Sequence, residues 1–251
     1  MRPPARARRA IVTAAALAAL AGAALALPAS APAQAQAPMP PFQADRISFI
    51  AIFPSVVVGD TAFLSGQFFH KDNPEAEPVD YRNHPVTLEA SPYPFTTWTA
   101  VASTTTDQGD IERGGGFFYF EQQPQVTTRY RVRATDPPAL SDERKVGVSP
   151  LLSLRARTRR SGRRLLVTLS GGVAPAHDGT KVSLQRRRAG RRAFRTVAQP
   201  TLRRRAKGGS RWSAQLSLQR GAAFDFRVVF AGDADHARGT SRTLTVRAPA
   251  R

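Results

Sequence analysis

The sequence of 251 residues holds 37 Lys and Arg against 18 Asp and Glu, giving a formal net charge of +19, and it contains no cysteine. The lack of cysteine excludes disulfides, thiolate metal sites, thiol catalysis and a lipid-modified cysteine. A cross-link-free chain of this length can still form two domains of about 100 residues, each burying enough surface to be stable.

Residues 1–37 have the order of a secretory signal peptide. Four arginines among the first nine residues precede an alanine- and leucine-rich run over residues 10–27, and small residues follow. These are the basic, apolar and cleavage regions of such a signal. We expect cleavage after Ala31, Ala35 or Ala37 and a mature chain without a membrane span. An uncleaved anchor is the alternative, which the weak membrane insertion of alanine disfavours.

The remainder contains two degenerate copies of one unit. Trp98-Thr99-Ala100-Val101-Ala102 and Tyr130-Arg131-Val132-Arg133-Ala134 belong to the first copy. Roughly a hundred residues later, Phe194-Arg195-Thr196-Val197-Ala198 and Phe226-Arg227-Val228-Val229-Phe230 repeat their pattern. We therefore expect two domains of one fold, over residues 38–148 and 149–251, joined stiffly at Ser149-Pro150.

Short strand-like segments follow one another throughout both units, and none has a helical period. In the first unit they are residues 47–53, 61–69, 85–90, 97–103, 117–121, 127–134 and 144–148. In the second they are residues 151–157, 164–170, 180–186, 193–198, 211–216, 224–230 and 242–246. Alternation places Tyr130, Val132 and Ala134 inward, and Val182 and Leu184 likewise. The fold class expected is all-β, with two tandem immunoglobulin-like antiparallel β-sandwiches.

The end of the second unit carries a family resemblance. In Phe230-Ala231-Gly232-Asp233-Ala234-Asp235-His236 an aromatic residue ends a strand and Gly-Asp makes the turn, and Ser241 then precedes the last strand. This resembles the closing signature of immunoglobulin-like repeats in secreted and cell-surface proteins of bacteria, of the actinobacterial type. The first unit has Ala134-Thr135-Asp136-Pro137-Pro138 there instead. The resemblance implies a spacer, adhesin or accessory module.

Charge is segregated between the two units. Residues 38–148 carry nine Lys and Arg and 14 Asp and Glu, about −5, whereas residues 149–251 carry 24 and four, about +20. A surface of that charge attracts anionic polymers, so we expect anionic cell-envelope polymers as partners. The candidate polyanion contacts are the densest basic clusters: Arg186, Arg187, Arg188, Arg191, Arg192, Arg203, Arg204, Arg205 and Lys207. The alternative is codon bias, since 33 of the basic residues are arginine.

Motifs for catalysis, cofactors or metals are not found. His70, His84, His177 and His236 have no metal-ligand spacing, and we interpret them as loop or edge residues. Asp107, Asp110 and Glu112 could together hold calcium, but a solvated acidic loop explains them better. The turn likewise explains Asp233 and Asp235. Neither a nucleophile elbow nor a sequence-specific nucleic-acid motif is present, so we expect a protein that is not an enzyme.

Aromatic residues gather in the first unit, which gives a second functional hypothesis. Trp98 and Tyr93 are candidates for stacking on sugar rings, and residues 117–120 place apolar groups on both faces of one strand. The first hypothesis is an exported, non-catalytic envelope or extracellular binding or spacer protein, held to anionic polymers by its basic second domain. The alternative is a carbohydrate-binding accessory module that uses aromatics of the first domain.

Overall fold

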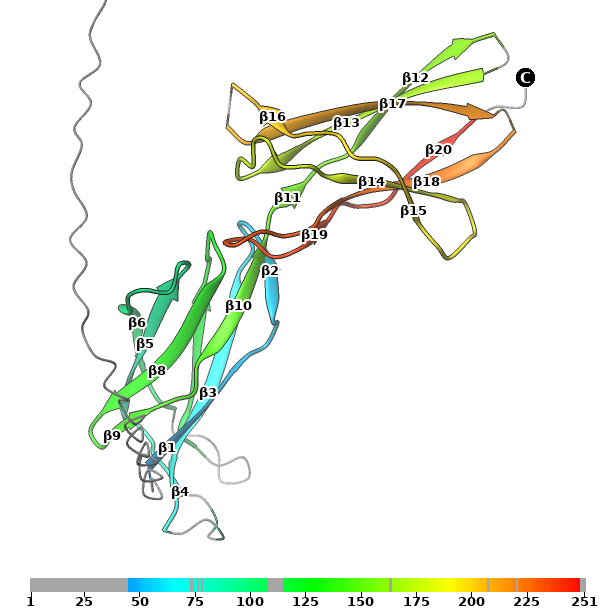
Figure 1. Ribbon diagram of the computed structural model, residues 1–251. Helices are drawn as coiled ribbons and strands as arrows, with labels where there is room; N and C mark the ends of the chain where they lie inside the picture. The colour runs from blue at the N-terminus through cyan, green and yellow to red at the C-terminus, as the bar shows by residue number, and fades with distance from the viewer. Residues whose placement is uncertain are drawn as a thin grey trace, which may run out of the picture. The chain divides into compact units, whose positions relative to one another are not determined.

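The computed structural model describes residues 45–248, apart from residues 73, 74, 76, 78, 108–114, 163, 207 and 220. The described residues form β-strands and loops, arranged as two immunoglobulin-like β-sandwiches (Figure 1). In this part of the chain there is no helix long and apolar enough to cross a membrane. The predicted signal peptide and Lys207 lie outside the described residues.

The first sandwich packs a sheet ordered β1-β3-β4, with β7 also on β3, against a sheet ordered β2-β10-β8-β5-β6, with β9 on β8. Its strands are β1 (Asp45–Ala51), β2 (Ser55–Val57), β3 (Ala62–His70), β4 (Val79–Asp80), β5 (Pro85–Pro92), β6 (Thr99–Thr105), β7 (Phe117–Gln122), β8 (Thr128–Thr135), β9 (Pro138–Leu140) and β10 (Arg144–Ser149). All strands pair antiparallel except β2, which runs parallel to β10 because the chain crosses from one sheet to the other after β1 without reversing.

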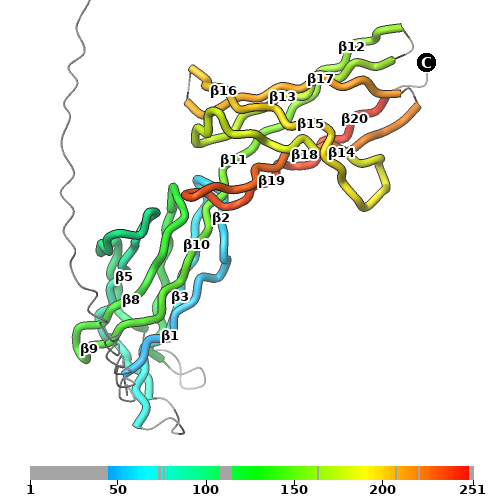
Figure 2. Tube along the Cα trace, viewed as in Figure 1, coloured from blue at the N-terminus to red at the C-terminus, as the bar shows by residue number. Residues whose placement is uncertain are grey.

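The second sandwich packs a sheet ordered β11-β13-β17-β16, with β12 also on β13, against a sheet ordered β15-β14-β18-β19, with β20 on β18. Its strands are β11 (Leu151–Leu152), β12 (Arg155–Ser161), β13 (Arg164–Ala174), β14 (Ser183–Arg188), β15 (Arg195–Ala198), β16 (Arg203–Arg204), β17 (Ser210–Gln219), β18 (Ala223–Phe230), β19 (Gly239–Thr240) and β20 (Leu244–Arg247). Figure 2 traces β13 and β17 side by side, as their ten-residue register requires.

Each sandwich has its own apolar core. The first core runs from Ile47 to Val148 and the second from Leu152 to Ala248, so the two divide at the predicted joint. The inward residues expected from alternation are buried: Tyr130, Val132, Ala134, Val182 and Leu184. Burial of that kind raises the pKa of the Tyr130 hydroxyl to about 12.

The strand predictions are confirmed with two kinds of difference. Every expected segment overlaps an observed strand, but residues 151–157 divide into β11 and β12. Five strands of two or three residues, β2, β4, β9, β16 and β19, were not expected. Two or three residues cannot show a period-two pattern, so pairing alone defines these strands.

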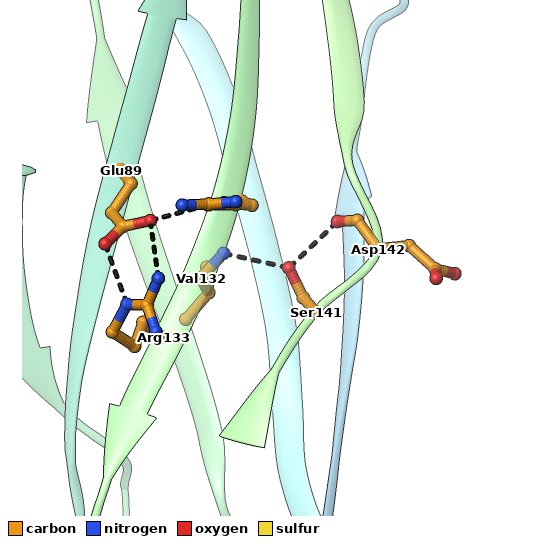
Figure 3. A network of polar contacts seen from close by, with 6 residues as sticks. Glu89, Val132, Arg133, Ser141 and Asp142 are labelled. Carbon is orange, nitrogen blue, oxygen red and sulfur yellow. Dashed lines mark hydrogen bonds and ion pairs between the residues drawn. The ribbon is translucent and has the colours of Figure 1, made fainter. Parts of the chain in front are cut away.

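A buried serine performs the same task in both sandwiches. The Val132 N–H donates to Ser141 Oγ at 2.8 Å, and this hydroxyl donates to the carbonyl of Asp142 at 2.9 Å (Figure 3). In the second sandwich the Val228 N–H donates to Ser241 Oγ at 3.0 Å. Each serine therefore accepts a hydrogen bond from a buried backbone N–H, that of Val132 in β8 or that of Val228 in β18.

Candidate functional site

Five arginines line a groove of about 1000 Å³ on the outer face of the β12-β13-β17-β16 sheet. Side chains two apart on a strand share a face, so Ser170 and Gly172 of β13 point outward with Arg211 and Ser213 of β17. Ser170, Gly172 and Ser213 form a floor of small residues, and Arg211 lies beside Gly172 in the same sheet. The other arginines that line the groove are Arg155, Arg157, Arg203 and Arg205. The groove is therefore a trough lined by guanidinium groups.

The register places like charges directly opposite each other in this trough. Arg203 of β16 is the cross-strand partner of Arg211 of β17, and both side chains are exposed. Like charges at such positions are destabilising. No Asp or Glu occurs among the described residues that line the groove. An anion between the two guanidinium groups would remove the repulsion, so the arrangement suits an anionic ligand.

The predicted cluster at Arg186, Arg187 and Arg188 lies on the other sheet, in β14. There Arg186 lies 4.9 Å from the centre of the Phe224 ring. The Arg187 guanidinium donates to Asp225 Oδ2 at 3.0 Å and lies 4.5 Å from the Phe194 ring centre. These two arginines are therefore engaged within the chain. The hydrogen bond from the Thr245 hydroxyl lowers the pKa of Asp225 most, and the hydrogen bond from Arg187 lowers it further.

The other predicted polyanion contacts are distributed over the second sandwich. Arg188, Arg191 and Arg192 are exposed at the predicted hairpin turn, the yellow loop between β14 and β15 in Figure 2. Arg203 and Arg205 line the groove, and Arg204 is exposed beside it. Arg155, Arg157 and Arg211 were not among the predicted residues. An alternation of arginine with smaller residues at 155, 157 and 159 was the available signal.

The predicted sugar-stacking residues Trp98 and Tyr93 each contact neighbouring side chains of the first sandwich. The Arg131 guanidinium lies 4.2 Å from the centre of the Trp98 ring, so it covers one ring face. Tyr93 is 39% exposed, and its ring meets Phe95 edge-on at 5.6 Å. Arg129 in turn lies 4.5 Å from the Phe95 ring centre. Intramolecular cation–π contacts therefore cover one face of Trp98 and the neighbouring Phe95 ring, while Tyr93 stays exposed.

A further group of exposed apolar side chains in the first sandwich lies on the β1-β3-β7 sheet. Phe117 and Tyr119 of β7 are exposed, whereas Phe118 and Phe120 are buried, as the strand alternation requires. With Ile50 and the backbone of β3, the two exposed rings line a groove of about 550 Å³. This groove is a second apolar surface of the first sandwich, besides Trp98 and Tyr93.

The expected acidic loop contributes a structural contact. Asp107 Oδ1 accepts a hydrogen bond from the Phe117 N–H at 3.0 Å, which anchors the start of β7. Asp110 and Glu112 lie outside the described residues. Asp107 therefore has a role in the fold that requires no calcium.

All four histidines lie in loops or at a strand end, as expected, but two of them are buried together. The rings of His177 and His236 are 4.8 Å apart, and Asp233 and Asp235 complete a four-residue cluster. The turn role of Asp233 is confirmed, because the His236 N–H donates to its Oδ1 at 2.8 Å. Sequence spacing could not reveal this cluster, since His177 belongs to a different loop.

No family model and no curated protein matches this chain. Among solved structures it is similar to a marsupial T cell receptor, with 12% identity and a TM-score of 0.33. The match covers 82% of this chain and 62% of the receptor chain.

Proposed function

We propose that this protein is an exported, non-catalytic binding protein whose second sandwich holds a linear anionic polymer of the cell envelope. The observation that carries the proposal is the trough of five arginines over a floor of serine and glycine. A trough of this form accepts a chain of repeated negative charges along its length. The unrelieved pairing of Arg203 with Arg211 makes an anion more favourable there than water.

The charge distribution supports the same function. The second unit carries about +20 and the first about −5, so the long-range field directs an anionic chain to the second sandwich. The expected signal peptide would deliver the protein to the compartment where such polymers occur. The resemblance to bacterial immunoglobulin-like repeats agrees with a binding or spacer role.

The test is the salt dependence of binding to poly(glycerol phosphate). Each arginine contact to a phosphate releases about one counterion, so log Kd should vary linearly with log salt concentration. The double variant Arg203→Gln and Arg211→Gln should weaken binding and reduce the magnitude of the slope by about two. Binding that is insensitive to salt would contradict the proposal.

A matched control separates the groove from general charge. Arg191→Gln with Arg192→Gln removes the same two charges from the exposed hairpin turn of the other sheet. This control should retain the slope of the parent protein to within about one counterion. Equal effects of the two double variants would show that attraction is diffuse and that the groove has no special part in it.

A carbohydrate-binding role for the first sandwich is the second candidate. The groove that carries it exposes Phe117 and Tyr119, 41% and 46% exposed, beside polar side chains such as Gln67. Retention on immobilised neutral glycans should be lost in Tyr119→Ala and kept in Trp98→Ala. If Trp98→Ala alone lost retention on the glycans, the sugar-binding residues would be those predicted from the sequence and not those of this groove.

A further inference from the structure

Two buried histidines and two aspartates converge at the end of the second sandwich, where β18 leads into the β19 strand. His177 comes from the loop before β14, and Asp233, Asp235 and His236 come from the loop between β18 and β19. One ligand atom from each of the four residues lies within 4.8 Å of the others. The side chains of His177 and His236 are 6% and 2% exposed.

The hydrogen bonds around the cluster fix which nitrogen of each ring carries a proton. His177 Nδ1 lies 2.9 Å from the carbonyl oxygen of Pro175, and His236 Nε2 lies 3.1 Å from that of Gln125. A carbonyl oxygen only accepts, so both nitrogens must donate. In the neutral rings, His177 Nε2 and His236 Nδ1 therefore present lone pairs. Backbone carbonyls orient metal-binding histidines in this same way.

These two lone pairs face carboxylate oxygens. His177 Nε2 is 3.3 Å from Asp233 Oδ2, and His236 Nδ1 is 3.1 Å from Asp235 Oδ1. His236 Nδ1 is buried and makes no well-aligned hydrogen bond. A lone pair against a carboxylate is repulsive. A single divalent cation between the four groups would accept both lone pairs and offset both carboxylate charges.

We propose that His177, Asp233, Asp235 and His236 form a binding site for a divalent transition-metal ion of the zinc type. Two imidazole nitrogens and two carboxylates are a donor set that zinc accepts. Ligands about 2.1 Å from a tetrahedral zinc ion lie about 3.4 Å from one another. The two observed nitrogen-to-oxygen distances, 3.3 and 3.1 Å, are close to this spacing, and all four ligand atoms lie within 4.8 Å of one another, so a small inward movement would complete the site. Calcium and magnesium are disfavoured, because both prefer oxygen ligands alone.

The location of the site gives the ion a structural consequence. The aspartate side chains are 33% and 42% exposed, which leaves a path for an ion to enter. The same loop bonds to the first sandwich, through Thr127 N–H to the Asp235 carbonyl at 2.8 Å and Ala237 N–H to the Val148 carbonyl at 2.7 Å. A bound ion therefore fixes the loop that meets the first sandwich.

The experiment is a zinc titration of the untagged, full-length protein after chelator treatment, followed by isothermal calorimetry and elemental analysis. The parent should bind one zinc ion per chain and melt at a higher temperature with zinc than without it. Calcium and magnesium should give neither effect. A parent that binds no zinc would overturn the proposal.

Two variants remove one ligand each while keeping the outer hydrogen bond. His236→Gln places an amide N–H near the Gln125 carbonyl, and His177→Asn does so near the Pro175 carbonyl. Loss of outer partners alone costs up to about 100-fold in affinity, so loss of a ligand should cost at least that factor. The control His70→Gln removes a histidine that contacts Asp45 and Asp72 in the first sandwich, and it should bind zinc as the parent does. Unchanged affinity in both ligand variants would refute the site.

Nuclear magnetic resonance of the parent gives a test that does not depend on how the variants fold. Zinc should shift the imidazole ¹⁵N signals of His177 Nε2 and His236 Nδ1 and leave those of His70 and His84 in place. Zinc-independent signals at His177 and His236 would also overturn the proposal.

Discussion

The two sandwiches share an internal frame while their outer surfaces differ. At one constant offset in the sequence, Glu89 corresponds to Gln185 and Arg131 to Arg227. Glu89 is the cross-strand neighbour of Arg131, and Gln185 is that of Arg227. Arg131 donates to Glu89 at 2.6 Å, and Arg227 donates to Gln185 at 2.8 Å. The two sandwiches therefore share this arginine contact, whether its acceptor is a carboxylate or an amide.

The aromatic partner of this arginine is also repeated. Arg131 lies 4.2 Å from the Trp98 ring centre, and Arg227 lies 4.1 Å from the Phe194 ring centre. Trp98 thus has a counterpart in the second sandwich that makes the same contact. A residue with a repeated structural role is a weaker candidate for a ligand contact than the arginines of the groove, which belong to the second sandwich alone.

Truncating a core leucine in each sandwich should have the largest effect. Leu88 and Leu184 are fully buried at corresponding positions, so Leu88→Ala and Leu184→Ala should each cost about 2–5 kcal/mol. Because the cores share no described residue, each variant should increase amide hydrogen exchange chiefly in its own sandwich. Peptide-resolved exchange measures this, and an equal rise in both sandwiches would instead indicate one cooperative unit.

Replacing the buried serine of either sandwich should have an intermediate effect on stability, of about the same size in both. Ser141→Ala and Ser241→Ala each leave a buried N–H without its acceptor, at about 1–3 kcal/mol. Urea denaturation measures the loss. Ser103→Ala is the control, since the exposed Ser103 hydroxyl lies 3.1 Å from that of Thr87 at the surface and should contribute little. A large loss in one sandwich and none in the other would break the correspondence.

Exchanging the acceptors between the sandwiches should have the smallest effect, and it should depend on pH. The hydrogen bond from Arg133 lowers the pKa of Glu89, partial burial raises it by less, and the contact with Arg131 lowers it further (Figure 3). A lowered pKa in the folded state stabilises the fold above the ordinary glutamate range, and this stability is lost as the pH falls through the folded value.

Glu89→Gln should therefore cost about 1 kcal/mol at pH 7, because Arg133 is 43% exposed and solvent screens its charge. The cost should decrease as the pH falls through the lowered pKa of Glu89, because the parent protein then loses the same charge. Gln185→Glu should show the opposite sign at pH 7. Urea denaturation over a series of pH values measures the difference, and a pH-independent cost of Glu89→Gln would show that shape, not charge, is responsible.

Local patterns in the sequence determined the fold class and most of the strands. Alternation from Tyr130 to Ala134 predicted which side chains of that strand are buried, and the repeat of this segment near Phe226 predicted a second sandwich. Charge counts separated an acidic unit from a basic one. These features depend on residues close together in the chain, which is why they can be predicted without a structure.

Contacts between distant segments were decided by the tertiary structure alone. The groove requires the register that places Arg203 beside Arg211, and the histidine cluster requires two loops to meet at His177 and His236. Tertiary packing also placed the guanidinium groups of Arg186, Arg187 and Arg131 against the rings of Phe224, Phe194 and Trp98. Composition determined that the second sandwich is basic, and strand register determined which of its arginines line the groove.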